Sequence, residues 1–383
     1  MRTATTRRLE CTPLPQVLYM ALELAEGKWK LGFTVAFGQR PRLREIAARD
    51  TAALVREIDE ALRRFRLDTT TPVLSCYEAG REGFWLHRFL EHAGVTNVVV
   101  DAGSMEMVPG RRRRKTDRLD TGKLLECLIR HREGRGRGRK VWSVVRVPTP
   151  EAEDARQLNR ELLSLRQDRT RLTNRMHGLL AGHGVRMEVR RDFPEQLDTV
   201  ALWDGSPLPP RLHMRLLREW VRLGLLCRQI HGLEQERREL LRTSEDESVE
   251  RVRKLLALRA IGINSAWLFV MEFFGWREFR NRRQVGALAG LVASPYSSGE
   301  SERELGISKA GNRHIRALAI EIAWSWLRFQ PQSQLAQWYE HRFAHGSRRI
   351  RKIGIVAVAR RLLIELWRYL ETGTPPAGAL LKA

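Results

Sequence analysis

The sequence is poor in cysteine. Its 383 residues contain only four, and they are scattered without any C-x-x-C pair: Cys11, Cys76, Cys127 and Cys227. A disulfide framework or a structural zinc site needs closely spaced or paired cysteines. We therefore expect neither, and interpret the four as reduced packing thiols in a cytoplasmic protein.

Long apolar runs are also lacking. No uninterrupted run approaches the roughly 18–20 residues that a membrane-spanning helix needs. The first residues show no signal-peptide pattern, which would combine a basic start with an apolar stretch. We expect a protein that does not insert into a membrane.

Acidic residues are scarce relative to basic ones. The chain has 45 Asp and Glu against 68 Lys and Arg, which leaves a net charge of +23 and a pI near 11.0. This excess indicates a polyanionic partner, either nucleic acid or an anionic membrane surface. The basic residues are spread over three regions and form no separate amphipathic anchor, so nucleic acid is favoured.

What the chain does have is enough apolar sequence for real cores. It is 43% hydrophobic, and its length allows two or three domains. The first domain, 1–145, reads as α/β. Two apolar runs flank a Glu-Gly-Lys turn and predict a β-hairpin, and strands then alternate with helices, which predicts a mixed sheet covered by helices. The expected strands are 17–25, 28–37, 72–79 and 96–102, and the expected helices are 50–66, 81–93 and 116–131.

Four acidic residues occur at informative places in this domain. Glu23 lies at the end of the first strand, and Glu78 lies at the end of a later one. Asp117 and Asp120 share one face of a helix, because residues three apart are neighbours there. Converging carboxylates repel each other unless a cation lies among them, and Mg²⁺ prefers oxygen ligands. Each acid taken alone is more often structural, so only their joint placement predicts a metal site.

The stretch "RRRRKTDRLD" (111–120) joins two of these acids to a basic run. Its aspartates could be local counter-charges that let a basic helix begin. They could instead hold a metal beside a phosphate backbone that is bound by Arg111, Arg112, Arg113, Arg114 and Lys115. The Gly/Arg stretch at 131–140 predicts a linker that also contacts phosphates.

The middle of the chain, 146–248, has heptad spacing. One helix carries Ala155, Leu158, Leu162, Leu165, Arg169, Leu172, Met176 and Leu179, and a second carries Leu216, Trp220, Leu223, Cys227 and Ile230. Such a seam is typical of helices that fold back on each other or pair with another subunit. Dimerisation is the preferred interpretation, and the intramolecular hairpin stays open.

The last region, 249–383, reads as all-helical. Residues 255–273 suggest a helix-hairpin-helix or an ordinary αα-corner. Residues 286–326 run through a polar loop with three serines into a helix, and basic side chains nearby indicate a phosphate-binding edge. The serines are Ser297, Ser298 and Ser301, and the basic residues are Lys309, Arg313 and Arg316. A final helix is expected over 346–370.

Several motifs occur in a specific order along the chain. They are "ALELAEGKWKLGF", "YEAG", "RKTDRLD", "LRAIGI", "AGLVASPYSSGE", "GISKAGNRHIR" and "VAVARRLLIELW". With these motifs the chain resembles transposases of the insertion-sequence "one-ten" family, the bridge-RNA-guided recombinases. The resemblance covers nearly the whole chain. It implies a RuvC-like (RNase H-like) N-terminal domain, a coiled-coil middle and a serine-bearing C-terminal domain.

The resemblance also implies roles for individual residues. The acidic set of the RuvC-like site corresponds to Glu23, Glu78, Asp117 and Asp120, with Mg²⁺ as the cofactor. Glu23 replaces the family's usual aspartate and is one methylene longer. The catalytic serine corresponds to Ser298, with Ser297 and Ser308 as alternatives.

The partners implied are double-stranded DNA of element ends and target, an element-encoded RNA, and further copies of the chain in a dimer or tetramer. The location implied is the prokaryotic cytoplasm, at the nucleoid. Two other classes of function fit the residues themselves. One is a metal-dependent nuclease or resolvase that uses water as its nucleophile, and the other is a non-catalytic nucleic-acid scaffold.

The basic run generates a first prediction. Replacing Arg111, Arg112, Arg113 and Arg114 with alanine should make nucleic-acid binding less dependent on salt. Each phosphate that a protein neutralises contributes a slope of about −0.7 to −0.9 in log affinity against log salt. Fluorescence anisotropy over a salt series measures this slope, and an unchanged slope would assign the arginines a merely solvated role.

Overall fold

The computed structural model describes residues 16–80, 82–101, 117–134, 141–298, 301–309 and 311–382. The chain divides into two compact units, Met1–Val147 and Pro148–Ala383. The first boundary expected from the sequence, after residue 145, lies two residues before this division. The expected middle and C-terminal domains lie together in the second unit.

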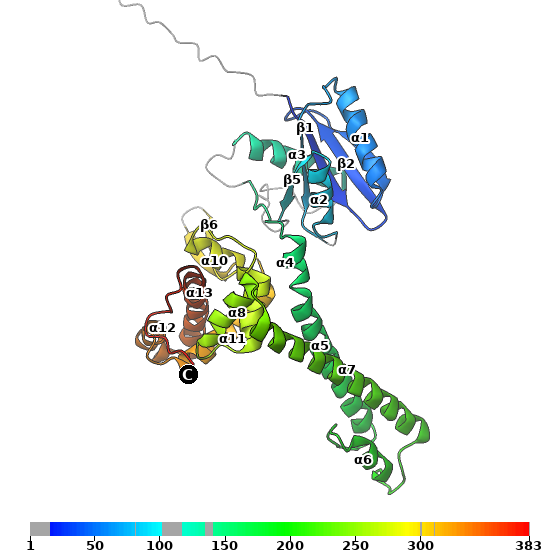
Figure 1. Ribbon diagram of the computed structural model, residues 1–383, viewed down its shortest axis with the longest axis vertical. Coiled ribbons are helices and arrows are strands. Elements are labelled where there is room, and N and C mark those ends of the chain that lie inside the picture. The colour runs from blue at the N-terminus through cyan, green and yellow to red at the C-terminus, as the bar shows by residue number, and fades with distance from the viewer. Residues whose placement is uncertain are drawn as a thin grey trace, which may run out of the picture. The chain divides into compact units, whose positions relative to one another are not determined.

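The first unit is built on a five-stranded mixed sheet (Figure 1). The strand order is β3-β2-β1-β4-β5, in which β1 runs parallel to β4 and antiparallel to β2. The predicted hairpin and mixed sheet are confirmed. The edge strand β3 escaped prediction because its charged sequence buries only Ile46. The strands are β1 (Leu18–Leu24), β2 (Lys28–Thr34), β3 (Arg42–Ala47), β4 (Val73–Glu78) and β5 (Thr96–Val100).

Helices cover both faces of this sheet. Helices α1 (Thr51–Arg64) and α2 (Trp85–His92) pack on the face formed by Met20 and its alternating neighbours. Helix α3 (Asp117–Arg132) packs on the opposite face, against Tyr19 and Ala21. Successive strand residues point to opposite faces, so odd-numbered residues of β1 face α3.

The second unit begins with a helical hairpin. Helix α5 (Gln157–Ala181) packs along α7 (Pro210–Thr243) of the same chain, after the short α4 (Pro150–Asp154) and with α6 (Phe193–Thr199) between them. The seam residues Leu162 and Leu172 on α5, and Leu216 and Leu223 on α7, are buried. The fold-back alternative therefore accounts for the seam within one chain, and these residues are not available as a subunit contact.

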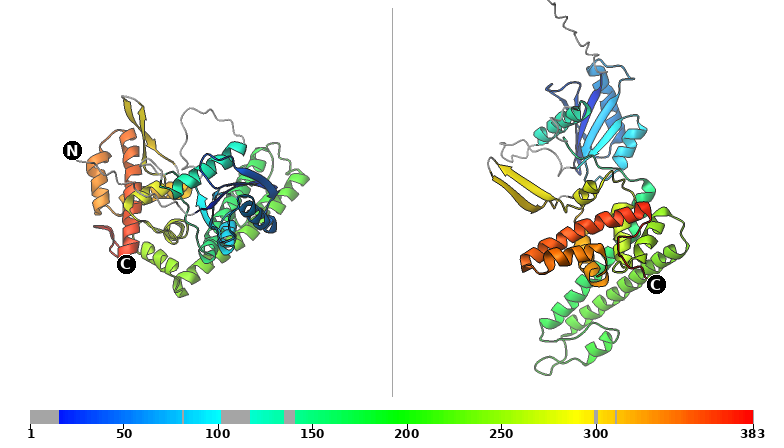
Figure 2. Two further views of the ribbon diagram at one scale, coloured as in Figure 1. Left: turned by 90° about the horizontal axis from the view of Figure 1, so that it is seen from above. Right: turned by 90° about the vertical axis from the view of Figure 1, so that its left-hand side faces the viewer.

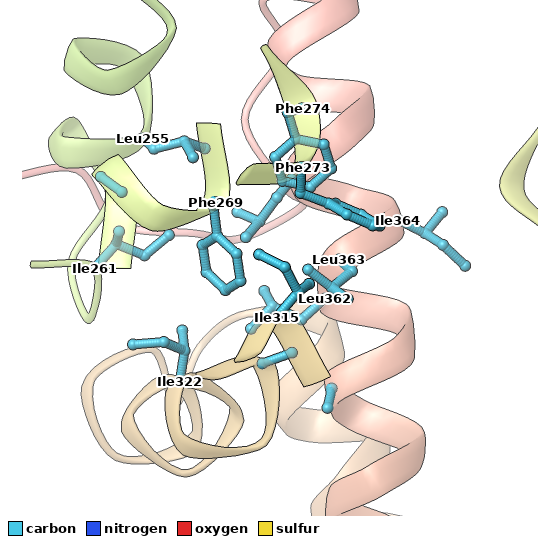
Figure 3. Close-up of a cluster of buried hydrophobic side chains, with 14 of the residues drawn as sticks. Leu255, Ile261, Phe269, Phe273, Phe274, Ile315, Ile322, Leu362, Leu363 and Ile364 are labelled. Atoms are coloured by element: carbon cyan, nitrogen blue, oxygen red, sulfur yellow. The ribbon is translucent and has the colours of Figure 1, made fainter. Parts of the chain in front are cut away.

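The rest of the second unit is a helical domain around one apolar core (Figure 3). Phenylalanines from α9 and η2 meet residues of α11 and α13 there. The predicted apolar helix, tight turn and second helix over 255–273 are confirmed as α8 and α9. The elements are α8 (Glu247–Ala257), α9 (Ile263–Phe269), the π-helix η2 (Val270–Phe274), α10 (Arg282–Leu288), α11 (Arg313–Phe329), α12 (Gln334–Tyr339), the π-helix η3 (Glu340–Ala344) and α13 (Arg348–Thr372).

The sequence led us to expect an all-helical domain here, and this prediction is wrong. The segment read as a polar loop forms an antiparallel hairpin of β6 (Ala293–Ser298) and β7 (Ser301–Ile307). Figure 2 shows the two strands extending away from the helices. A strand pair outside a core needs no apolar alternation, so its serines and charged residues resemble loop sequence.

The cysteine prediction is partly wrong. Among the described residues, Cys76, Cys127 and Cys227 are in the thiol form. Burial raises the pKa of the Cys76 thiol well above its usual range, with further contributions from Cys127 and Glu78. Cys227, however, is exposed on α7, so it is neither a packing thiol nor part of the buried seam that the heptad spacing predicted. Cys11 lies outside the described residues.

The contact of α3 with the sheet depends on Gly32. A Cβ atom at this position would lie 2.5 Å from Thr121 Cγ2 and 3.2 Å from Leu125 Cδ1. Gly32→Ala should therefore destabilise the protein by about 1–3 kcal/mol, the usual cost of overpacking a core. Thermal unfolding measures the loss.

Gly27→Ala is the matched control, since no atom lies within 4 Å of a Cβ there. Adding Thr121→Ser to Gly32→Ala should restore part of the stability by removing the clashing methyl group. Equal stability of the Gly32 and Gly27 variants would show that α3 does not pack as described.

Candidate active site and its basic surroundings

Two of the four acidic residues lie side by side on the sheet. Strands β1 and β4 are parallel with Ala21 opposite Cys76 and Leu22 opposite Tyr77. The next residues in this register are Glu23 and Glu78. Neighbouring strands are about 4.8 Å apart, so the two glutamates occupy the same level at the carboxyl ends of adjacent strands. The alternation of the strands places both on the face that α3 covers.

Helix α3 crosses this face in the direction opposite to β1. Its last residue, Arg132, donates from Nη1 to Tyr19 Oη at 2.9 Å, near the start of β1. Its second turn contacts the middle of the sheet, because Thr121 packs on Gly32 and Gly32 pairs with Ala21. The helix therefore begins at the end of the sheet that carries Glu23 and Glu78.

This direction brings Asp117 and Asp120 to the same edge. Both belong to the first turn of α3, one to four residues before Thr121. With a rise of 1.5 Å per residue, they extend roughly 2–6 Å further toward the carboxyl ends of the strands. Their side chains lie outside the part of the structure that is described. The backbone therefore places the first turn of α3 at the edge that carries Glu23 and Glu78, and the convergence of all four side chains stays a prediction.

The environment of the two glutamates is partly enclosed. Glu23 is half-buried, with its Oε2 atom fully covered, and it lies opposite Lys30 in the β1–β2 register. Glu78 is also half-buried, and its charge contributes to the raised pKa of Cys76. The Cys76 thiol in turn reaches the carbonyl of Leu124 on α3, 3.8 Å away. Glu78 therefore lies near the layer between sheet and helix.

An all-oxygen set of this kind suits a hard divalent cation. Carboxylates at one level on adjacent strands repel each other, and a cation relieves that repulsion. Glu23 and Glu78 fit such a role by register, and the two aspartates fit it by their place on α3. Among the side chains that the structure describes, which do not include those of Asp117 and Asp120, no three His, Cys, Asp or Glu form a metal-binding group.

The predicted arginine run has no structural description. Arg111, Arg112, Arg113, Arg114 and Lys115 lie outside the described residues, immediately before α3. Their place in the sequence puts them close along the chain to Asp117 and Asp120. Their contact with phosphate stays a prediction.

The candidate nucleophiles lie at opposite ends of the β6–β7 hairpin. Ser298 ends β6 and pairs with Ser301, and Ser297 pairs with Glu302. Ser308 follows β7 at the base, where its backbone N–H donates to Val292 O at 2.8 Å. Ala293 and Ser298 are five residue steps apart along β6, or roughly 17 Å. Ser298 and Ser308 therefore cannot serve the same phosphate in one hairpin position.

The motif "GISKAGNRHIR" forms the connection from the hairpin to α11. Gly311 has φ +98°, and a Cβ there would lie 2.2 Å from Leu288 O, so only glycine fits. Asn312 caps α11 by accepting from the backbone N–H groups of His314 and Ile315. These two structural roles escaped the sequence reasoning, although Gly-Asn before a helix is a recognisable start signal.

The three basic residues of this motif differ in their surroundings. Arg316 Nη1 donates to the carbonyl oxygens of Lys309 (3.0 Å) and Ala289 (3.4 Å), which ties the connection to the end of α10. Lys309 and Arg313 are exposed. These two cations are placed to meet a phosphate near the base of the hairpin.

Comparison with known proteins shows the family of the chain. The model of the "Transposase IS116/IS110/IS902 family" matches residues 252–339, which include the hairpin and its connection to α11. The chain is 37% identical over 378 residues to "Putative transposase y4rJ" of Sinorhizobium fredii, and this covers 95% of the chain and 94% of that relative. The chain belongs to the IS116/IS110/IS902 transposase family.

Other members of the family are more distant. The chain is 31% identical to the transposase for insertion sequence element IS1328 of Yersinia enterocolitica, over 59% of the chain and 66% of that protein. It is 27% identical to the transposase for IS1111A of Coxiella burnetii, over 65% and 64%.

The family membership confirms the resemblance found in the motifs. A transposase cleaves and transfers DNA, and this accords with the large positive charge. Across the described ranges, no helix is long and apolar enough to cross a membrane.

Proposed function

We propose that this transposase recombines DNA under the guidance of an RNA, through a carboxylate site that holds Mg²⁺ and a serine that forms a covalent bond with DNA. The observation that carries the proposal is the direction of α3. It brings two aspartates to the sheet edge where the register of β1 and β4 aligns two glutamates. This is the arrangement expected of a RuvC-like (RNase H-like) site.

The carboxylates of Glu23, Glu78, Asp117 and Asp120 would hold Mg²⁺ at this edge. When bound, the ion would polarise the scissile phosphate and stabilise the departing oxygen. The protein's own contribution is to fix the four oxygen-bearing groups on two strands and one helix. Thr121 and Gly32 maintain that geometry, because they determine how closely α3 approaches the sheet.

The covalent step is assigned to Ser298. Its Oγ attacks a DNA phosphate, a bond forms between that oxygen and phosphorus, and the bond to one sugar oxygen breaks. The serine proton passes to solvent, and the departing sugar oxygen takes up a proton. Attack by the hydroxyl of another strand reverses these changes and releases the serine. The ester conserves the phosphodiester bond, so rejoining requires no nucleotide cofactor.

Lys309 and Arg313 hold the same strand further along. They lie at the base of the hairpin, roughly 17 Å from Ser298, which corresponds to about five phosphates of a B-form strand. Their role in this proposal is to neutralise phosphates that flank the attacked one, which fixes the register of the DNA on the hairpin.

Further copies of the chain would assemble through α7. Met214, Val221 and Leu225 are 50%, 69% and 50% exposed, and they recur at seven- and four-residue intervals on one face. An exposed apolar row with this spacing is typical of a helix that pairs with another helix. A dimer or tetramer formed there would leave the buried α5–α7 seam intact.

The proposal of an RNA partner is supported by the family resemblance and by the net charge of +23.

The carboxylate site generates a prediction. The double variant Asp117→Asn, Asp120→Asn should lose DNA strand cleavage by at least a hundredfold while nucleic-acid binding stays within a few-fold of wild type. Removing two ligands weakens the metal site but also lowers repulsion toward phosphate. A cleavage gel and an anisotropy titration measure the two effects.

Glu126→Gln is the matched control, because Glu126 is exposed on the same helix. It should cleave as the wild type does. Wild-type cleavage by the double aspartate variant would exclude the carboxylate site.

The serine generates a separate prediction. Ser298→Ala should bind DNA normally but form no denaturant-resistant protein–DNA adduct and no recombinant product, because the attacking oxygen is missing. Denaturing gels of a labelled substrate detect the adduct. Ser297→Ala and Ser308→Ala are controls that keep Ser298, and both variants should still form the adduct.

Loss of the adduct in one of these control variants, with its retention in Ser298→Ala, would reassign the nucleophile. Cleavage that no serine variant affects would favour hydrolysis by water.

A further inference from the structure

A large recess lies in the second unit beside the base of the β6–β7 hairpin. Its volume is about 1670 Å³, and one face of α13 forms its long wall. Arg349 and Arg360 belong to this arginine wall. Ile353, Val356 and Ile364 lie between and beyond them at helical spacing and form the apolar floor. From Arg348 to Arg368 the wall extends roughly 30 Å, at 1.5 Å per residue. Helix α10 closes the other side near Gly286, where a Cβ would lie 3.1 Å from Arg360 Nε.

The recess is strongly basic. Seven arginines and one lysine line it, against a single carboxylate, Glu365, which is paired with Arg368 at 3.0 Å. Within the described ranges, seven of these cations have no carboxylate partner: Arg282, Arg283, Arg348, Arg349, Lys352, Arg360 and Arg361. Cations gathered in a concave wall without counter-charges attract a polyanion.

The floor of the recess is apolar, which a phosphate backbone alone does not need. Ile353 is 54% exposed there, and Val356 and Ile364 continue the same stripe. Beside them the Arg361 guanidinium stacks on the Trp338 ring, with 3.8 Å between its Cζ and the ring centroid. Bases that are not paired stack on apolar and aromatic surfaces and on planar guanidinium groups.

The recess also leads to the proposed nucleophile. Ala293 and Ile307, the paired residues at the base of the hairpin, line its edge together with Gly306. A strand that leaves the recess there reaches the hairpin whose far end carries Ser298. Strand exchange requires an unpaired DNA strand close to the attacking serine.

We propose that this recess binds single-stranded DNA, with its bases against the apolar floor and its phosphates on the arginine wall, and delivers it along the hairpin to Ser298. The proposal rests on the proposed function for its choice of DNA. The binding mode itself follows from the combination of an apolar floor, a stacked guanidinium and unpaired cations.

Anisotropy titrations of the full chain test this binding mode. The probes are a labelled oligothymidine and an abasic oligonucleotide of equal length and charge. Wild type should prefer the oligothymidine by tenfold or more, since only it has bases to stack. In Ile353→Asn, Arg361→Lys this ratio should fall toward one. That double variant keeps the net charge and changes two exposed side chains, so phosphate binding should persist.

Two charge variants complete the test. Arg349→Ala, Lys352→Ala should weaken both probes by a similar factor and reduce the salt slope, because phosphate contacts are lost. Arg56→Ala, Arg64→Ala removes the same charge from exposed positions on α1, and it should leave both the ratio and the affinity nearly unchanged.

Several outcomes would overturn the proposal. They are a ratio near one in wild type, an unchanged ratio in Ile353→Asn, Arg361→Lys, or a preference for a duplex of the same length. Tighter binding of oligouridine that the same variant abolishes would assign the recess to RNA instead. All titrations repeated in Ser298→Ala should give the same ratios, so loss of the covalent chemistry and loss of this binding site are separate results.

Discussion

The close approach of α3 to the sheet at Gly32 is the constraint on which the acidic site depends. Thr121 occupies the space that any side chain at position 32 would fill. The C-terminal end of α3 is held separately by the hydrogen bond from Arg132 to Tyr19. Two attachments along one helix fix both its height above the sheet and its direction. The first turn of α3 therefore lies at the edge of the sheet where Glu23 and Glu78 are aligned.

A similar division between positioning and chemistry holds in the second unit. Gly311 and Asn312 shape the start of α11, and Arg316 ties the preceding connection to the end of α10. None of these three contributes a reacting group. They hold the base of the β6–β7 hairpin in a defined relation to α10 and α13. The residues to which we assign chemical roles, Ser298 and the cations of the recess, belong to the hairpin and to the helices α10 and α13 beside its base.

Much of the first unit could be predicted from the sequence, because its cores follow simple periodicities. The alternation in β1 and β2 and the turn between them gave the hairpin, and the buried runs gave β4 and β5. The same alternation placed Glu23 and Glu78 at strand ends. The alternation does not predict the register between β1 and β4, and it is this register that brings Glu23 and Glu78 to one level. Strand pairing is set by contacts far apart in the sequence.

The second unit was harder to predict for the opposite reason. The strands of its hairpin consist largely of serines and charged residues, so they carry no periodic apolar signal. The heptad seam was visible in the sequence, but spacing alone does not distinguish a partner in the same chain from one in another. The recess along α13 combines residues from five separate elements. Of the recess wall, the sequence predicted only that a final helix covers 346–370.

The pairing of β6 with β7 has a consequence for how the hairpin's reach could change during evolution. Adding one residue to each strand moves the tip by only about 3.3 Å, but it also turns every later side chain to the opposite face. Adding two residues to each strand keeps the facing of the serine and moves it by roughly 6.6 Å, about the span of two phosphates. Reach and facing are therefore coupled, and a working hairpin can lengthen or shorten only in steps of two pairs. The distance from the base of such a strand pair to its tip therefore takes discrete values.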